Sequence, residues 1–130
     1  MKQLPERVLY VEDDADIRSV AELALADVGG FCVCLCASGQ EALAQIDDFG
    51  PDLVLLDVMM PGMDGPQTLQ ALKQRPRGLD VPVVFMTARL QPSEIEEYRA
   101  LGAIGVIPKP FDPMTLADDI RALLASVSTG

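Results

Sequence analysis

The sequence predicts an α/β domain, a doubly wound five-stranded parallel sheet of strand order 2-1-3-4-5 with helices on both faces. Five short apolar runs alternate along the chain with five segments in which apolar residues recur at helical spacing. One run, residues 53–56, is apolar at every position, as expected of a strand that is buried on both faces. Because strands that alternate with helices are joined by right-handed crossovers, we expect all five strands to be parallel.

The chain opens with a strand, a helix and a second strand. Residues 7–11 form a short run of β-branched and apolar character, which predicts the first strand. Apolar residues then recur at helical spacing over residues 17–28, and Gly29-Gly30 ends this helix. Residues 31–37 are expected to form the second strand.

The middle of the chain continues the alternation. Ser38 and Glu41 have the spacing of a capping box and open the second helix, which ends near residues 49–51. The third strand follows and emerges from the core at Asp57. The third helix begins at Gly65-Pro66, since proline is favoured in the first helical turn.

The fourth and fifth strands flank the fourth helix. Residues 81–86 are expected to be a strand, with Pro82 near its start, where a missing N–H is best tolerated. Residues 92–96 have capping-box spacing and open the fourth helix, which runs to about residues 101–102. Residues 103–108 give a short fifth strand.

The fifth helix completes a single domain of residues 1–130. Asp112 is expected to cap this helix and Pro113 to be its first residue. Its apolar stripe is Leu116, Ile120, Leu123, Leu124 and Val127. We expect the core to cover about residues 6–125 and residues 126–130 to be a frayed tail or the start of a linker.

The composition excludes several classes of function. Twenty acidic against ten basic residues give a net charge of −10, which repels phosphate backbones and anionic membrane surfaces. We therefore expect no direct contact with nucleic acid and none with a membrane. The N-terminal residues lack the hydrophobic region of a signal peptide, so a cytoplasmic location is expected.

The three cysteines alternate with apolar residues in one strand. Cys32 and Cys36 would lie about 13 Å apart on an extended chain, too far to share a zinc ion. Neighbouring pairs would have parallel side chains, which disfavours a disulfide. We interpret all three as reduced thiols that act as small apolar residues.

Acidic residues end two strands that the predicted order makes neighbours. Glu12 and Asp13 follow the first strand and Asp57 ends the third, so their carboxylates should crowd together at one edge of the sheet. Such crowding raises pKa values or requires a cation, and hard oxygen ligands suit Mg²⁺. The alternative is a solvated loop in which Asp14 caps the first helix and Asp57 caps a turn.

A hydroxyl and an ammonium group end the next two strands. Thr87 follows the fourth strand and Lys109 the fifth. Flanking a carboxylate and a metal ion, they would form a site prepared for a tetrahedral oxyanion. A carboxylate can itself accept a phosphoryl group, so Asp57 is the candidate acceptor.

Four motifs in this order resemble the receiver domain of two-component response regulators. They are VLYVEDD at 8–14, LVLLDVMMPGMDG at 53–65, VVFMTA at 83–88 and PKPF at 108–111. The resemblance implies the flavodoxin-like receiver fold, with Asp57 as the phosphoacceptor. It also implies a Mg²⁺ site in which Asp13 is a direct ligand, Glu12 acts through water and Met59 offers its backbone carbonyl.

The same resemblance implies roles on the other side of Asp57. Thr87 would meet the incoming phosphoryl group, Lys109 would pair with it, and the Lys109–Pro110 bond would be cis. The family's usual aromatic residue three positions before the lysine is replaced here by Val106, which has no polar tip and little rotamer freedom.

The expected function is phosphorylation-controlled signalling. The chain contains no histidine, so the phosphoryl donor would be a partner histidine kinase, a histidine phosphotransfer protein or a small acyl or amido phosphate. The output would be contact with a downstream protein, with no enzymatic activity beyond self-catalysed phosphorylation and dephosphorylation. The alternatives are the receiver part of a longer regulator, a scaffold without phosphoryl chemistry, and an Asp-nucleophile phosphatase.

Individual residues help to distinguish these alternatives. A phosphatase would need a second acidic residue two positions after Asp57, where this chain has Met59. The presence of Asp13, Asp57, Thr87 and Lys109 together argues against a scaffold without phosphoryl chemistry. Met59 and Arg89 are expected to tune the lifetime of the phosphoryl group. Tyr98, with Ile95 and Leu101, either lines a partner face or packs as an ordinary helix.

Overall fold

The computed structural model describes residues 6–128, which form five strands and the helices between them. In chain order the elements are β1 (Arg7–Val11), α1 (Ala15–Glu22), η1 (Leu23–Val28), β2 (Cys32–Cys36), α2 (Gly39–Phe49), β3 (Leu53–Asp57), α3 (Gly65–Lys73), β4 (Val83–Thr87), α4 (Pro92–Ala100), β5 (Gly105–Pro108) and α5 (Leu116–Ser128). In this part of the chain no helix is long and apolar enough to cross a membrane.

All five strands are parallel, in the order β2-β1-β3-β4-β5, as predicted. The central pairing aligns Val11 of β1 with Leu56 of β3. The residues that follow this pair, Glu12 and Asp57, therefore lie side by side at the carboxyl edge of the sheet. Strand order thus determines which side chains meet there.

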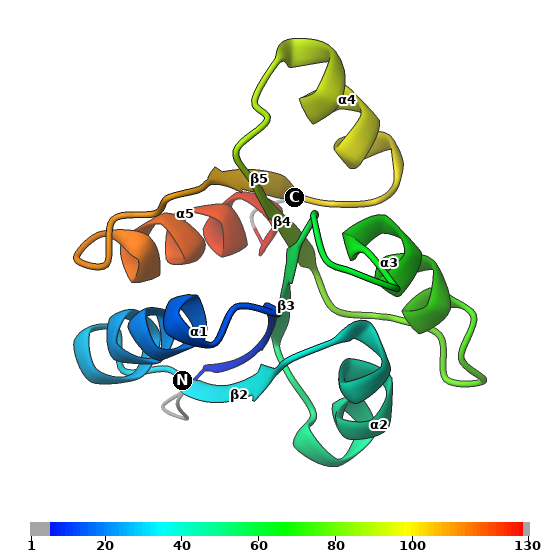
Figure 1. The fold of residues 1–130 in the computed structure, drawn as a ribbon, viewed down its shortest axis with the longest axis horizontal. Coiled ribbons are helices and arrows are strands. Elements are labelled where there is room, and N and C mark those ends of the chain that lie inside the picture. Colours follow the sequence, from blue (N-terminus) through cyan, green and yellow to red (C-terminus); the bar gives the residue numbers. More distant parts are fainter. Residues whose placement is uncertain (1–5, 129–130) are drawn as a thin grey trace.

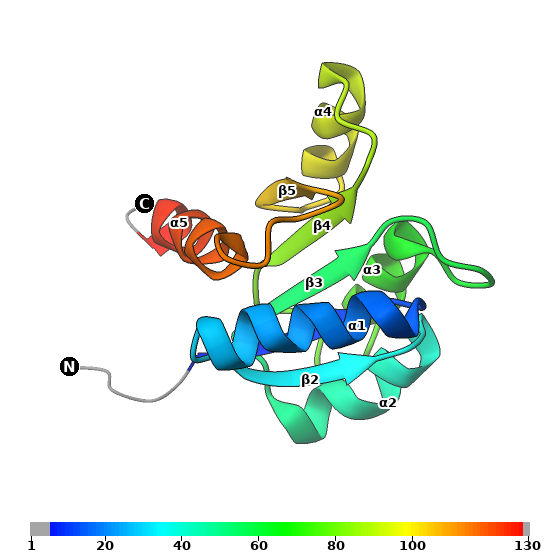
Figure 2. The ribbon, with the colours of Figure 1, turned by 60° about the vertical axis from the view of Figure 1, so that its left-hand side comes forward.

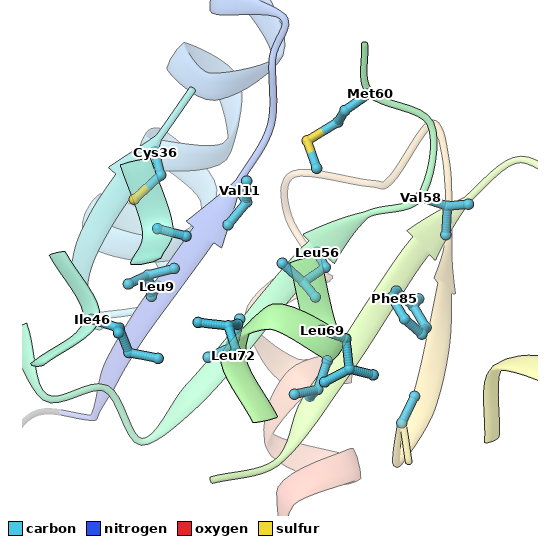
Figure 3. Close-up of a cluster of buried hydrophobic side chains, with 14 of the residues drawn as sticks. Leu9, Val11, Cys36, Ile46, Leu56, Val58, Met60, Leu69, Leu72 and Phe85 are labelled. Carbon is cyan, nitrogen blue, oxygen red and sulfur yellow. The ribbon is translucent and has the colours of Figure 1, made fainter. Parts of the chain in front are cut away.

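Helices cover both faces of the sheet (Figures 1 and 2). The helices α1 and α5 lie on one face, where Ala21 and Ile120 join a buried cluster with the alternate residues of the strands. The helices α2, α3 and α4 supply Ile46, Leu72 and Tyr98 to the cluster on the other face. Figure 3 shows this second cluster, with side chains from the helices packed onto the central strands.

Three strands begin later than the sequence predicted, two because a backbone N–H bonds back to the preceding helix and one because a proline has no N–H. Phe31 N donates to Leu25 O at 2.9 Å, which ties Phe31 to the preceding helix instead of to β2. Pro82 has no N–H, and β4 starts at Val83. Ala103 N donates to Tyr98 O at 3.2 Å, so Ala103 closes α4 and β5 starts at Gly105.

The first helix departs from the expected regular helix in its second half. Residues Leu23–Val28 form a π-helix, in which the hydrogen bonds are one residue wider than in an α-helix. Gly29 follows it, and a Cβ there would lie 2.5 Å from the Cβ of Ala117 on α5. The glycine therefore allows a close approach between α5 and the end of this helix.

Helix caps agree with the sequence only in part. Ser38 Oγ accepts from Glu41 N at 3.1 Å, while Glu41 Oε1 accepts from Ala37 N instead of Ser38 N. The predicted capping box at the start of α4 is wrong, because Gln91 is the capping residue and makes no side-chain bond.

The start of the third helix holds a capping box that sequence analysis missed. Asp64 Oδ1 accepts from Gln67 N at 2.9 Å, and Gln67 Oε1 accepts from Asp64 N at 3.0 Å. The expected start at Gly65-Pro66 is confirmed.

The fifth helix begins at Leu116, and the prediction that Pro113 is its first residue is wrong. Asp112 caps a turn that precedes the helix, accepting from Met114 N at 2.9 Å through its side chain and from Leu116 N at 3.0 Å through its carbonyl. The helix continues to Ser128, so residues 126–128 are helical, and the expectation of a frayed tail or the start of a linker at residues 126–130 stays a prediction. Residues 129–130 and the side chain of Val127 lie outside the described part.

The central strand should dominate stability. Leu55 is fully buried between Tyr10 of β1 and Val84 of β4, so Leu55→Ala is expected to lower the free energy of unfolding by about 2–5 kcal/mol. Leu90→Ala is the matched control, since Leu90 is 41% exposed and the same truncation should cost within about 0.5 kcal/mol. Chemical denaturation measures both, and equal costs would contradict the packing described.

Candidate functional site

Asp57 lies at the end of β3 and is only 3% exposed. The chain turns sharply after it, since Gly65 N donates to Val58 O at 3.0 Å. A Cβ on Gly65 would lie 2.6 Å from the carbonyl oxygen of Asp57, so only glycine fits this close approach. The packing of α3 against the strand end therefore fixes the position of Asp57.

Glu12 and Asp13 follow β1 at the same edge of the sheet. Glu12 is 1% exposed, and its Oε2 accepts from Asp14 N at 3.1 Å, whereas Asp13 is exposed. Arg18 Nη1 donates to the carbonyl of Glu12 at 2.7 Å, which holds the loop against α1. Asp14 caps α1, as the loop interpretation expected, but Glu12 and Asp13 lie with Asp57 in one acidic group.

Lys109 joins the two buried carboxylates. Its Nζ lies 2.8 Å from Glu12 Oε1 and 3.1 Å from Asp57 Oδ1. Its backbone N donates to Thr87 O at 3.0 Å, and the Lys109–Pro110 bond is cis, as the resemblance implied. The ends of β1, β3 and β5 thus supply the groups of one charged cluster.

The charges in this cluster are unequally distributed. Burial, reinforced by the nearby Glu12 carboxylate and opposed by Lys109, raises the pKa of Asp57 from 3.8 to about 6. Burial alone would raise the pKa of Glu12, but hydrogen bonds from Lys109 and the Asp14 backbone lower it below its ordinary value. Burial alone would lower the pKa of Lys109, but the two carboxylates raise it. Glu12 and Lys109 therefore form the ionised pair, and Asp57 is the group that gains and loses a proton.

The acidic group suits a hard divalent cation. Glu12, Asp13 and Asp57 each offer one carboxylate oxygen, and these oxygens lie within 4.8 Å of one another. Carboxylate oxygens are the ligands that Mg²⁺ prefers. The predicted contribution of the Met59 carbonyl stays a prediction; the Met59 side chain is 63% exposed.

Thr87 ends β4, the strand next to β3, and is 2% exposed. Its Oγ1 accepts from Arg89 N at 3.0 Å, which leaves the hydroxyl proton for another acceptor. Arg89 is also 3.9 Å from Glu94 through its Nη1. Thr87 therefore keeps a hydroxyl proton that it can donate at the end of β4.

The aromatic contact on this side of the sheet comes from α4. Val106 pairs with Phe85 in the sheet, and the ring of Tyr98 lies 5.2 Å from the ring of Phe85. Tyr98 is 7% exposed, so the packing interpretation of Tyr98 holds and the partner-face interpretation is wrong for this residue. Ile95 and Leu101 are half-buried.

Tyr10, which was not among the predicted site residues, contacts the site from the core. Tyr10 is fully buried in β1, and its hydroxyl donates to Glu12 Oε1 at 3.1 Å. Tyr10 and Glu12 lie on the same face of the strand because they are two residues apart. The sequence did contain a signal for this contact: Tyr10 carries a hydroxyl in an otherwise apolar strand and stands two residues before Glu12.

Known sequences that are similar to this chain include those of response regulators. A family model described as "Response regulator receiver domain" matches residues 8–121. Response regulator Rre1 of Synechocystis sp. is 39% identical over 122 residues, covering 93% of this chain and 52% of that protein. The phosphate regulon transcriptional regulatory protein PhoB of Escherichia coli is 35% identical over 125 residues, covering 96% of this chain and 54% of that protein. The chain spans about half the length of these relatives.

Comparison with solved structures agrees with the sequence matches. The chemotaxis protein CheY4 of Vibrio cholerae is similar with a TM-score of 0.84 and 32% identity, covering 92% of this chain and 99% of that one. A CheY-like receiver domain protein from Methanospirillum hungatei has a TM-score of 0.78 and 28% identity, covering 98% and 100%. The predicted fold is confirmed. Because PhoB is named as a transcriptional regulatory protein, the expected absence of nucleic-acid contact gains no support from the relatives.

The raised pKa of Asp57 predicts how stability changes with pH in metal-free protein. A folded-state pKa of about 6 lies above the unfolded value, so protonated Asp57 favours the folded state at low pH and this contribution is lost as pH rises through about 6. Between about pH 5 and pH 8 the free energy of unfolding should fall by roughly 1 kcal/mol. Because its pKa is lowered, Glu12 changes protonation below this pH range. The chain has no histidine that would titrate within the range.

Denaturation in EDTA at several pH values measures this change. Asp57→Asn should abolish the decline, whereas Asp27→Asn, at an exposed position, should retain it. A decline of the same size in Asp57→Asn would assign it to another group.

Proposed function

Because the chain belongs to the response regulator receiver domain family, we propose that it accepts a phosphoryl group on Asp57 in a Mg²⁺-dependent reaction and signals through a change in protein contact. The observation that carries this proposal is the placement of the Asp57 carboxylate. It is buried, contacts the Lys109 ammonium at 3.1 Å, and lies within one acidic group with Glu12 and Asp13.

The transfer step follows from these positions. A carboxylate oxygen of Asp57 attacks phosphorus, and the bond from phosphorus to the donor's imidazole nitrogen, or to the acyl oxygen of a small donor, breaks. The bonding electron pair leaves with the donor group, as neutral imidazole after proton uptake or as a carboxylate. Asp57 must be ionised to attack, and a pKa of about 6 leaves it mostly ionised near neutral pH.

Two side chains act on the oxygens of the transferring group. The Lys109 ammonium can move from the carboxylates to pair with a phosphoryl oxygen, and the Thr87 hydroxyl can donate its proton to another. In both cases the donor is already at the site, because Lys109 is held by Glu12 and Thr87 is held by the backbone of Arg89.

The metal would be held by Asp13 and Asp57 directly, by Glu12 through water and by the carbonyl of Met59. When bound, Mg²⁺ supplies positive charge that neutralises the carboxylates and the phosphoryl oxygens. Asp13, the exposed member of the group, is open to the solvent from which the ion arrives.

The donor and the output are also proposals. A histidine kinase or a histidine phosphotransfer protein would supply the phosphoryl group, since response regulators partner with histidine kinases and this chain has no histidine. The output would be contact with a downstream target, either a separate protein or an output domain of a longer regulator. We propose that this domain acts in the cytoplasm, makes no direct contact with nucleic acid because of its net charge of −10, and catalyses only its own phosphorylation and dephosphorylation.

The proposal is tested by intact-mass measurement after incubation with acetyl phosphate. Wild-type protein with Mg²⁺ is expected to gain the mass of one phosphoryl group, and EDTA should abolish the gain. Asp57→Asn should show no gain because the carboxylate nucleophile is absent. Asp64→Asn is the matched control, since an asparagine can still cap α3 and the variant should be phosphorylated like wild type.

No gain in folded wild-type protein, with acetyl phosphate and with a panel of phosphorylated histidine kinases, would contradict the proposal. A gain that persists in Asp57→Asn would move the acceptor to another residue.

A further inference from the structure

Tyr10 carries a hydroxyl into an otherwise apolar layer of the core. Its ring is fully buried between β1 and the helices α1 and α5. The surrounding cluster includes Val8, Ala21, Leu25, Leu55 and Leu116. A phenylalanine ring would fill the same space without the cost of burying a polar group. Packing therefore explains the ring but leaves the hydroxyl unexplained.

The hydroxyl is directed at the site. It donates to Glu12 Oε1 at 3.1 Å, the same oxygen that accepts from Lys109 Nζ at 2.8 Å. The second oxygen of Glu12 accepts from Asp14 N at 3.1 Å. A tyrosine hydroxyl is protonated at neutral pH and a carboxylate oxygen can only accept, so Tyr10 is the donor in this contact.

Glu12 Oε1 therefore has two donors, and only one of them is free to leave. Lys109 is shared with Asp57 and is half-buried on a long flexible chain. Tyr10 is fixed by its buried ring. When Lys109 pairs with a phosphoryl oxygen, Glu12 Oε1 loses its direct hydrogen bond from the ammonium, and a metal ion that Glu12 contacts only through water does not replace that bond at Oε1. A buried carboxylate oxygen in this position is costly unless another donor remains.

We propose that Tyr10 is a positioning residue for phosphoryl transfer, whose hydroxyl keeps Glu12 Oε1 hydrogen-bonded when the Lys109 ammonium leaves that oxygen for the phosphoryl group on Asp57. This inference rests on the proposed function, and it adds a residue from the core to the machinery. Tyr10 stabilises the state in which Lys109 has moved more than the state in which Lys109 still contacts Glu12. A residue that served packing alone would stabilise both states equally.

The test compares two binding constants in Tyr10→Phe, a change that removes the hydroxyl and keeps the ring. Beryllofluoride, with saturating Mg²⁺, is the probe for the state with an occupied acceptor, and Mg²⁺ alone is the probe for the state before transfer. Calorimetry should show beryllofluoride bound about 5- to 10-fold more weakly than by wild type. The affinity for Mg²⁺ alone should change by less than about twofold, because Lys109 still holds Glu12 in that state.

The matched control is Thr68→Val. Thr68 is fully buried, and its hydroxyl donates to Asp64 O at 2.8 Å on α3, so the variant also loses a buried hydrogen bond. It should lower the free energy of unfolding while leaving both binding constants like those of wild type. This separates a general loss of stability from an effect on Glu12.

Equal changes in both binding constants of Tyr10→Phe, or no change in either, would overturn the role of Tyr10 and leave the proposed function intact. A wild-type protein that binds neither beryllofluoride nor a phosphoryl group would overturn the proposed function, and the role of Tyr10 with it.

Discussion

The Lys109 ammonium, shared between the carboxylates of Glu12 and Asp57, is the interaction on which the site depends. Two buried carboxylates side by side repel each other, and one ammonium cannot neutralise both together with the exposed Asp13. The cluster is left with excess negative charge, and burial, reinforced by the neighbouring Glu12 carboxylate, raises the pKa of Asp57. A cation and a phosphoryl group relieve this imbalance together, because the cation neutralises carboxylates while Lys109 becomes available to the phosphoryl oxygens.

The fold holds this charged cluster in place through elements that are themselves rigid. Asp57 is fixed by the buried strand β3 and by the close approach of Gly65, and Glu12 is fixed by Arg18 from α1 and by Tyr10 from the core. Strand β5 lacks the aromatic residue that the family usually has three positions before the lysine. It carries Val106 there, beside Phe85 of β4, and the aromatic contact with Phe85 comes instead from Tyr98 of α4.

The sequence was sufficient to predict the strand order and the meeting of Glu12, Asp13 and Asp57, because alternating strands and helices leave few topologies and strand ends share one edge. It was insufficient for features that depend on competing local hydrogen bonds. Asp112-Pro113 is equally suited to capping a turn and a helix, and only the backbone around Leu116 decides between them. The π-helix of Leu23–Val28 has no residue signature, and the role of the Tyr10 hydroxyl depends on the side-chain direction of Glu12.

A crystal structure with Mg²⁺ and beryllofluoride bound would locate the acceptor, the metal and the Lys109 ammonium at once, and so test whether phosphoryl transfer to Asp57 draws Lys109 away from Glu12. We expect beryllium bonded to a carboxylate oxygen of Asp57, Mg²⁺ held by Asp13 and Asp57, and Lys109 Nζ moved from Glu12 to a fluorine while Tyr10 keeps its contact with Glu12. Beryllofluoride away from Asp57, or a Lys109 that remains on Glu12 Oε1 with the acceptor occupied, would contradict this expectation.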